Sequence, residues 1–324
     1  MTTQATPARC LSHHEKPLPL QQAVEALRDR IRQEGDQPQA PVAEQLALVD
    51  QLTQFALGRY LLTHGGFNGY WTRYAVLHPQ RGRKTGLNHD GEPFTELESW
   101  ILDRWPAIRA TQERFQIFQR VLQGLIRDGA TLVSVACGTM EDLLGLDYSH
   151  APNACLLGMD IDPESLDQAR ERARELGLLN RVELTQGDAW NLALPDCRDG
   201  LACSGLSVYE TDPQRVTDLY RRFHTALKPG GTLVTSFITP PPWADPKSPW
   251  DLTRIAPRDL QRNRLLAHAR RVRVGFTTAE AVRRQLKQAG FTAIQVLNDR
   301  CRVYPTAVAR KSQNSSCAGA KVDV

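Results

Sequence analysis

The stretch VSVACGTMED, residues 133–142, decides the fold, because an apolar run leads into a glycine turn and then into two acids. The apolar run belongs to TLVSVA (131–136), whose apolar and β-branched residues predict a strand. Gly138 allows the backbone to turn sharply and to approach a ligand closely. A strand, a tight turn and a helix-prone segment in this order predict a ligand site at the end of the strand.

The same pattern continues outward from this strand, since short apolar runs alternate with amphipathic stretches from Asp128 onward. The alternation predicts a parallel sheet covered on both faces, with ligands bound beyond the carboxyl ends of its strands. KPGG (228–231) is expected to end one helix before the next strand. The predicted strands are 131–136, 154–160, 181–188, 199–205, 231–237, 293–298 and 305–310, and the predicted helices are 163–176, 213–227 and 277–289.

The residues before Asp128 predict a separate helical segment. Apolar spacing predicts a helix over 20–34, a second helix from Val42 and one or two more over 96–127. The stretch 64–93 is rich in glycine, aromatic and basic residues and is expected to be irregular. The expected organisation is a disordered 1–19, a helical cap or lid over 20–127, a main domain over 128–310 with an insert at 238–276, and a disordered tail over 311–324.

Composition restricts the class of protein. The chain has 324 residues, of which 41% are hydrophobic and 23% are charged, as in ordinary soluble domains. No apolar run is long enough to span a bilayer and the N-terminus lacks a signal-peptide core, so we expect a cytoplasmic protein without a membrane partner. The seven scattered cysteines form no CxxC pair and are expected to be reduced. A net charge of +4 does not by itself indicate nucleic acid, and we expect no such partner.

Acids follow the second and third predicted strands as well. In MDID (159–162), Asp160 stands about 20 residues beyond the turn, where a carboxylate can bind both hydroxyls of a ribose. In GDAW (187–190), Asp188 can accept a hydrogen bond from an adenine amino group, and the next backbone N–H can donate to the ring. Ile161 and Trp190 can enclose the adenine, although Trp190 is equally typical of a core position.

With these motifs in this order, followed by LKPGG (227–231), residues 129–310 resemble the class I S-adenosylmethionine-dependent methyltransferases. The resemblance implies a doubly wound, Rossmann-like, seven-stranded sheet with an N-terminal helical cap, and S-adenosylmethionine as cofactor. It implies that the first loop lines the methionine part, that Asp160 holds the ribose and that Asp188 with Ala189 holds the adenine. The predicted cofactor residues are Ala136, Cys137, Gly138, Thr139, Asp142, Asp160, Ile161, Asp188, Ala189, Trp190 and Ser204.

The first loop departs from the family pattern. Family members usually have an acid where this chain has Ser134, and glycines where it has Ala136 and Met140. Met140 predicts a backbone conformation that is not the one glycine adopts. Glu141 or Asp142 can then contact the amino group of the cofactor, or both can simply favour the N-terminus of the following helix.

Other classes fit less well. A nicotinamide oxidoreductase needs a GxGxxG turn, and the two carboxylates after Gly138 would repel its pyrophosphate while tolerating a cofactor that carries a sulfonium and an ammonium. A non-catalytic cofactor-binding module remains an alternative, against which the intact MDID and GDAW motifs argue. SGLSVYETD (204–212) lacks the (Asn/Asp)-Pro-Pro-aromatic motif of nucleic-acid amino methyltransferases. HDGEP (89–93) predicts a turn, and we predict no metal site.

Methyl transfer from a sulfonium is an in-line displacement, which needs alignment, exclusion of water and a base where the acceptor carries a proton. In this fold the residues after the fourth strand face the sulfonium. Tyr209 and Glu210 are the candidates for orienting the acceptor or removing its proton; alternatively Tyr209 packs on the sheet and Glu210 begins a helix. His64 is a further candidate base.

Two segments can supply an acceptor pocket. The stretch 60–79 is either a lid or aromatic packing between cap and sheet, and the arginine-rich insert 238–276 is either an anion clamp or a solvated helix face. We therefore predict methyl transfer to O or N of a small molecule, with a protein or RNA methyltransferase as the alternative and the oligomeric state left open. The predicted substrate residues are Tyr70, Trp71, Tyr74, Ser207, Trp243 and Arg254.

Overall fold

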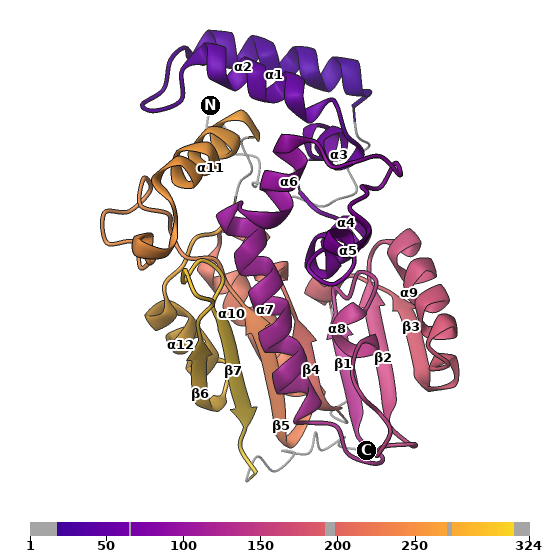
Figure 1. Ribbon diagram of the computed structural model, residues 1–324. Helices are drawn as coiled ribbons and strands as arrows, with labels where there is room; N and C mark the ends of the chain where they lie inside the picture. The colour runs from indigo at the N-terminus through magenta and orange to yellow at the C-terminus, as the bar shows by residue number, and fades with distance from the viewer. Residues whose placement is uncertain (1–17, 65, 192–197, 271–273, 314–324) are drawn as a thin grey trace, which may run out of the picture.

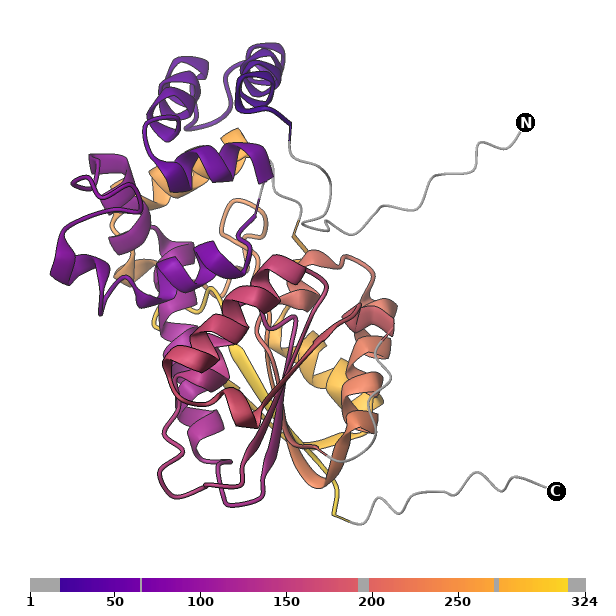
Figure 2. The same ribbon diagram turned by 90° about the vertical axis from the view of Figure 1, so that its right-hand side faces the viewer.

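The computed structural model describes residues 18–64, 66–191, 198–270 and 274–313. The predicted disordered ends therefore lie outside the described residues, except for 18–19 and 311–313. The described chain forms a sheet with helices on both faces and a helical body above one end of it (Figures 1 and 2). Within the described residues, no helix combines the length and apolarity needed to cross a membrane.

The sheet has seven strands in the order β3-β2-β1-β4-β5-β7-β6. Strands β1 to β5 run parallel, whereas β7 is antiparallel to both of its neighbours, β5 and β6. The parallel arrangement predicted from the alternation of strands and helices is confirmed for β1 to β5, whereas β7 is reversed because the short link between the last two strands cannot hold a crossover helix. The strands are β1 (Thr131–Val135), β2 (Cys155–Asp160), β3 (Val182–Gln186), β4 (Arg198–Cys203), β5 (Leu227–Ser236), β6 (Phe291–Leu297) and β7 (Thr306–Lys311).

The strand order changes direction at β1, which lies between β2 and β4. The chain runs outward through β2 and β3 on one side of β1 and through β4 and β5 on the other. Loops that leave β1 and β4 therefore diverge at their carboxyl ends, and this opening is where doubly wound folds bind ligands.

Helices cover the two faces of the sheet according to the alternation of its side chains. Leu132 and Val234 face a layer made by α7, α8 and α9, whereas Val133 and Leu233 face a layer made by α10 and α12. Side-chain caps begin three of these helices: Asp162 caps α9, Asp212 caps α10 and Thr278 caps α12. The layer helices are α7 (Pro106–Gln123), α8 (Glu141–Leu144), α9 (Pro163–Glu175), α10 (Pro213–Ala226) and α12 (Ala279–Gln288).

The KPGG segment belongs to β5, not to a break before it. β5 begins at Leu227, and its register against β4 shifts between Arg198 and Gly200. Gly230 has a φ of 80°, which lets the chain absorb the extra residues as an irregularity in the strand. The predicted start of this strand at 231 is therefore too late.

The helical body above the sheet contains residues from both halves of the sequence. Trp100 donates from Nε1 to Asp259 at 2.8 Å, and Trp105 donates from Nε1 to Asn263 at 2.5 Å, so α11 of the insert packs into the N-terminal helices (Figure 2). We call this body the cap. Its helices are α1 (Leu20–Glu34), α2 (Val42–Leu52), α3 (Ala56–His64), α4 (Gly69–Leu77), α5 (Gly82–Thr85), α6 (Glu96–Asp103), the start of α7, and α11 (Pro257–Arg270).

The stretch 64–93 is more ordered than its composition predicts, because it contains α4 and α5. The side chain of Asn68 accepts a hydrogen bond from the backbone N–H of Trp71 and caps α4. Trp71 and Ala75 are buried in the cap core, and this burial stabilises a helix that glycine and aromatic content alone do not indicate. The predicted turn at 89–93 is confirmed, since Leu87 and Pro93 form an antiparallel bridge around it.

Candidate active site

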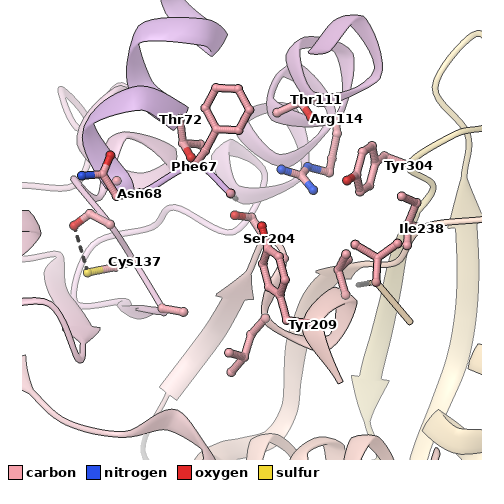
Figure 3. A pocket seen from close by; sticks show the side chains of 18 of the residues that line it. Phe67, Asn68, Thr72, Thr111, Arg114, Cys137, Ser204, Tyr209, Ile238 and Tyr304 are labelled. Atoms are coloured by element: carbon pink, nitrogen blue, oxygen red, sulfur yellow. Dashed lines mark hydrogen bonds between the residues drawn. The ribbon is translucent and has the colours of Figure 1, made fainter. Parts of the chain in front are cut away.

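A cavity of about 800 Å³ lies at the carboxyl ends of the parallel strands, beneath the cap. Its floor comes from the loops after β1, β2, β3 and β4, and α4 and α7 form much of the opposite wall (Figures 1 and 3). Every residue predicted to bind the cofactor lines this cavity. The volume lies within the range of about 300–1,000 Å³ that small-molecule sites occupy.

The loop after β1 keeps a glycine-type backbone without all of the glycines. Ala136, Gly138 and Met140 have φ values of 53°, 52° and 58°, all in the left-handed region. The expectation that Met140 changes the backbone conformation is therefore wrong. The Met140 side chain is fully buried in the core between β1, β2 and α9, and this packing holds a conformation that costs a non-glycine residue about 1–2 kcal/mol.

The two acids that follow the loop have different partners. Asp142 is buried and accepts a hydrogen bond of 2.8 Å from the hydroxyl of Ser134, which occupies the position of the usual family acid. Burial raises the pKa of Asp142 to about 6. Glu141 instead pairs with Arg73 of α4 at 2.9 Å and with Arg172 of α9 at 3.4 Å. Glu141 is thus held by helices on both sides, and Asp142 is the acid without a cationic partner among the described residues.

Asp160 and Asp188 stand at the ends of the neighbouring strands. Asp160 accepts a hydrogen bond of 2.7 Å from the backbone N–H of Gly138, which ties the end of β2 to the first loop. Asp188 accepts from the backbone N–H of Trp190 at 2.9 Å and from the amide of Asn191 at 2.9 Å. Carboxylates after three adjacent strands therefore line one cavity.

Hydrophobic surfaces complete this end of the cavity. Ile161 is 46% exposed at the rim, whereas Ala189 is buried. Trp190 packs against the sheet core, and the guanidinium of Arg215 lies 5.3 Å from the centre of its ring. Both interpretations of Trp190 thus have a geometric basis, because the same side chain touches the core and lines the cavity.

Helix α4 of the cap directly contacts the loop after β1 that contains Gly138, which we call the cofactor loop. A Cβ atom on Gly69 would lie 2.6 Å from Ser165 Oγ, so no side chain fits between the start of α4 and the sheet domain. Arg73, one helical turn further, makes the ion pair with Glu141. The start of α4 is therefore packed on the loop that lines the cavity.

The aromatic residues of α4 that were predicted to bind the substrate lie away from the cavity. Tyr70, Trp71 and Tyr74 do not line the cavity, and neither does His64; they pack together inside the cap. His64 stacks on Tyr60 with ring centres 3.9 Å apart, and Tyr70 hydrogen-bonds His89 at 2.6 Å. The geometry favours the alternative that these aromatics are packing residues.

The opposite side of the same segment does line the cavity. Phe67, Asn68 and Thr72 line it (Figure 3), and so does Val76; Asn68, Thr72 and Val76 have the i, i+4 and i+8 spacing of one helix face. The sequence prediction missed this face because it chose the aromatic residues Tyr70, Trp71 and Tyr74, which lie on the opposite face of α4. A helical-periodicity test starting from Asn68 as the cap would have identified it.

The residues after β4 divide in the same way. Ser204 and Tyr209 line the cavity (Figure 3). Ser207 does not, and its hydroxyl donates to the backbone oxygen of Ser236 at 3.2 Å. Glu210 accepts from the backbone N–H of Asp212 at 2.9 Å and pairs with Arg215 at 3.1 Å, so it supports the start of α10 and does not enter the cavity.

The insert contributes one predicted residue to the cavity. Trp243 lines it and contacts Trp250, with ring centres 5.7 Å apart. Arg254 is exposed and pairs with Asp251 at 3.0 Å, away from the cavity. Arg262 lies over the ring of Trp100 in the cap, and two further arginines of the predicted anion clamp, Arg271 and Arg273, lie outside the described residues.

Arg114 was missed by sequence reasoning. It lies on α7 within a face that lines the cavity, and the residue is 8% exposed. Its Nη1 donates to Ser236 Oγ at 3.3 Å, and its guanidinium lies 4.9 Å from the centre of the Tyr304 ring. The available signal was the helix period, which places Arg114 on the same side as Thr111 and Phe118.

No metal centre is indicated in the described part of the chain, where no three His, Cys, Asp or Glu side chains form a group that could hold an ion. The site is therefore defined by the carboxylates of the strand ends on one side and by a mixed aromatic and polar wall on the other.

Comparison with known proteins agrees with this arrangement. A family model described as a methyltransferase domain matches residues 133–231, which hold the first three strand-end acids. A demethylmenaquinone methyltransferase from Symbiobacterium thermophilum is 32% identical over 117 residues, covering 35% of this chain and 45% of that protein. The biotin biosynthesis bifunctional protein of Teredinibacter turnerae is 26% identical over 242 residues, which cover 66% of this chain and 39% of that protein. The chain spans less than half the length of these curated relatives.

One solved structure matches nearly end to end. It is a possible exported protein from Bordetella parapertussis, 42% identical, with a TM-score of 0.83 over 90% of this chain and 95% of that one. Fold and site define a Rossmann-like domain with a seven-stranded sheet whose last pair of strands is antiparallel. With the domain match over residues 133–231, the chain contains a class I S-adenosylmethionine-dependent methyltransferase domain.

Proposed function

We propose that this protein transfers a methyl group from S-adenosylmethionine to an O or N atom of a small-molecule acceptor. One observation carries the proposal: Asp142, Asp160 and Asp188, each beyond a different adjacent strand, line a single cavity beneath the cap. These three carboxylates suit a ligand with a cationic end, a ribose diol and an adenine amine, because carboxylates accept hydrogen bonds from all three groups.

Each acid has a separate part in holding the cofactor. Asp142 would hold the cationic methionine end, Asp160 the ribose hydroxyls, and Asp188 the adenine amine, with the backbone N–H of Ala189 donating to the ring. Ile161 and Trp190 would enclose the adenine, since both line the cavity beside Asp188. When bound, the cofactor supplies an electrophilic methyl group on a sulfonium that departs as a neutral thioether.

The acceptor would enter between the loop after β4 and the cap. Ser204 lies at the end of β4, and Tyr209 is the one predicted catalytic residue that lines the cavity, since His64 and Glu210 do not. The Tyr209 hydroxyl would orient the acceptor and relay the proton that an O–H or N–H acceptor loses as its bond to the methyl carbon forms, passing its own proton to water as it takes the acceptor's. The α4 and α7 walls keep competing water from the reacting atoms.

A small acceptor is favoured over a protein or RNA because α4 and α7 form one wall of the cavity above the strand ends. The names of several relatives point in the same direction, since demethylmenaquinone is itself a small molecule. We propose that the cap, predicted over 20–127, ends within α7 and includes α11 of the 238–276 insert, and that the later part of α7 belongs with the cofactor domain, predicted over 128–310. A reducing, cytoplasmic location remains our prediction from the scattered cysteines.

The test is methyl transfer by the full-length protein. Purified protein is incubated with S-adenosylmethionine labelled with tritium in the methyl group and with extracts separated into small-molecule, protein and RNA fractions. We expect label in the small-molecule fraction. Label confined to protein or RNA would replace the acceptor class, and cofactor binding without transfer to any fraction would favour a non-catalytic binding module.

A further inference from the structure

The most unusual charge in the molecule is the guanidinium of Arg114. Arg114 as a whole residue is 8% exposed, and it forms no ion pair with any carboxylate in the described chain. Arg73 and Arg172 have side chains that are 24% and 15% exposed, yet both pair with Glu141. Arg114 is buried and Arg73 and Arg172 are half-buried, but Arg114 is the one of the three without a carboxylate of the described chain at ion-pair distance.

The local contacts of Arg114 compensate its burial only in part. One hydrogen bond goes to the neutral hydroxyl of Ser236, and the Tyr304 ring offers its negative face at 4.9 Å. Burial lowers the pKa of Arg114 and the nearby charge of Asp299 acts in the opposite direction, but a guanidinium stays charged at every physiological pH. A buried cation is costly unless an anion meets it, so the free energy of this site favours a ligand with negative charge.

The rest of the cavity wall shows where such a ligand would lie. The acids that line the cavity come from the loops after β1, β2 and β3 and from α10, on the cofactor side. Around Arg114, by contrast, stand Thr111, Tyr209, Tyr304 and Ser204, which carry hydroxyl groups and no negative charge (Figure 3). The described cavity is therefore acidic at the end that suits the cofactor and cationic at the end left for the acceptor.

The other arginines of the lining have partners already. Arg73 pairs with Glu141, Arg215 pairs with Glu210, and Arg222 also makes an interaction within the chain. One positive charge with a planar fork of N–H donors matches a singly charged, planar carboxylate better than a phosphate dianion.

We propose that Arg114 is an acceptor-binding residue that takes a carboxylate, and that the methyl acceptor is therefore a small carboxylic acid. This rests on the proposed function, because it assumes that the cavity beyond the cofactor holds the acceptor. The ion pair would anchor one end of the acceptor against α7 and so determine which of its atoms reaches the methyl group beside Ser204 and Tyr209.

The experiment measures ligand binding to the full chain saturated with S-adenosylhomocysteine, by calorimetry. The probes are benzoate, its neutral isostere benzamide, and phenyl phosphate. We expect benzoate to bind at least about 10-fold more tightly than benzamide, as a charge-assisted bidentate pair allows. Equal binding of the two would overturn the anion subsite, and tighter binding of phenyl phosphate would overturn the carboxylate assignment.

Variants separate a binding role from a structural one. Arg114→Met should lose the preference for benzoate while its melting temperature without ligand stays the same or rises, because a buried unpaired charge has been removed. Arg114→Lys should retain part of the preference, since it keeps the charge and loses the fork. If Arg114→Met melts lower and still prefers benzoate, Arg114 is structural and the proposal fails.

The readouts also distinguish this proposal from the proposed function. If the folded wild-type protein does not bind S-adenosylhomocysteine, the proposed function itself is contradicted. Normal S-adenosylhomocysteine binding with no preference for a carboxylate would contradict only the assignment of Arg114.

Discussion

Gly69 and Gly138 meet backbone to backbone: a Cβ atom on Gly138 would lie 2.9 Å from Gly69 Cα, and one on Gly69 would lie 2.8 Å from Gly138 Cα. Gly69 is the first residue of α4 in the cap, and Gly138 is the turn of the cofactor loop. Because both lack a side chain, the cap packs directly on the loop. The position of the cap and the shape of the cofactor site are therefore coupled.

The first prediction tests this contact. Gly69→Ala would place a methyl group against Gly138 and Ser165, so α4 must move away from the loop. We expect cofactor affinity to fall by about 10-fold or more, a loss of roughly 1.4 kcal/mol, measured by calorimetry. Gly124→Ala is the matched control, since its new methyl group meets nothing closer than 3.4 Å. Equal affinity in both variants would show that the contact is incidental.

The second prediction concerns Asp142, whose pKa of about 6 lies above its ordinary value of 3.8. The folded protein then holds this proton more tightly than the unfolded chain, so the stability it confers is complete below pH 3.8 and is lost as pH rises through 6. Asp142→Asn should raise the free energy of unfolding at pH 7.5, without cofactor, by up to about 2 kcal/mol.

The same substitution should weaken the cofactor. Protonation below pH 6 removes the charge that would face the cationic end of the cofactor, so wild-type affinity should fall there. In Asp142→Asn the affinity should be lower and should lose this pH dependence. Denaturant unfolding and calorimetry over pH 5–8 check both effects. A variant that is both less stable and normal in binding would contradict the role of Asp142.

How far the sequence predicts the molecule depends on how local the determinants are. The strands, the capped helices and the positions of Asp160 and Asp188 follow from short patterns, because burial alternation, caps and strand ends are written within a few residues. The antiparallel β7 is an exception, since direction depends on the length of the connection and on pairing across the sheet.

The parts that sequence reasoning placed wrongly depend on contacts between distant residues. Asp259 accepts a hydrogen bond from Trp100 across the chain, which brings α11 into the cap and Arg262 over the ring of Trp100. Tertiary packing also decides which side chains reach the cavity. Packing of α4 places Tyr70 inside the cap, and packing of α7 places Arg114 in the cavity wall. Residue type alone favoured the aromatic Tyr70 as a ligand contact, so the sequence prediction included Tyr70 and not Arg114.

The third prediction separates the candidate catalytic residues. Tyr209 lines the cavity and His64 does not, so Tyr209→Phe should lower kcat by about 10²-fold, as expected for loss of a positioned proton-transfer group. His64→Phe preserves a ring against Tyr60 and should leave kcat unchanged. The measurement is turnover of the identified acceptor at saturating cofactor, with cofactor affinity unchanged in both variants. The reverse ranking would return His64 to the active site.

The central claim is that the strand-end acids bind S-adenosylmethionine, and calorimetric titration of this cofactor into Asp160→Ala tests it most directly. We predict micromolar binding by the wild-type protein and a loss of about 2 kcal/mol in Asp160→Ala, as for a charge-assisted hydrogen bond. Asp167→Ala, which removes an exposed acid on α9, should bind as the wild type does. Absence of binding by the folded wild-type protein, or preferential binding of NAD, would contradict the account.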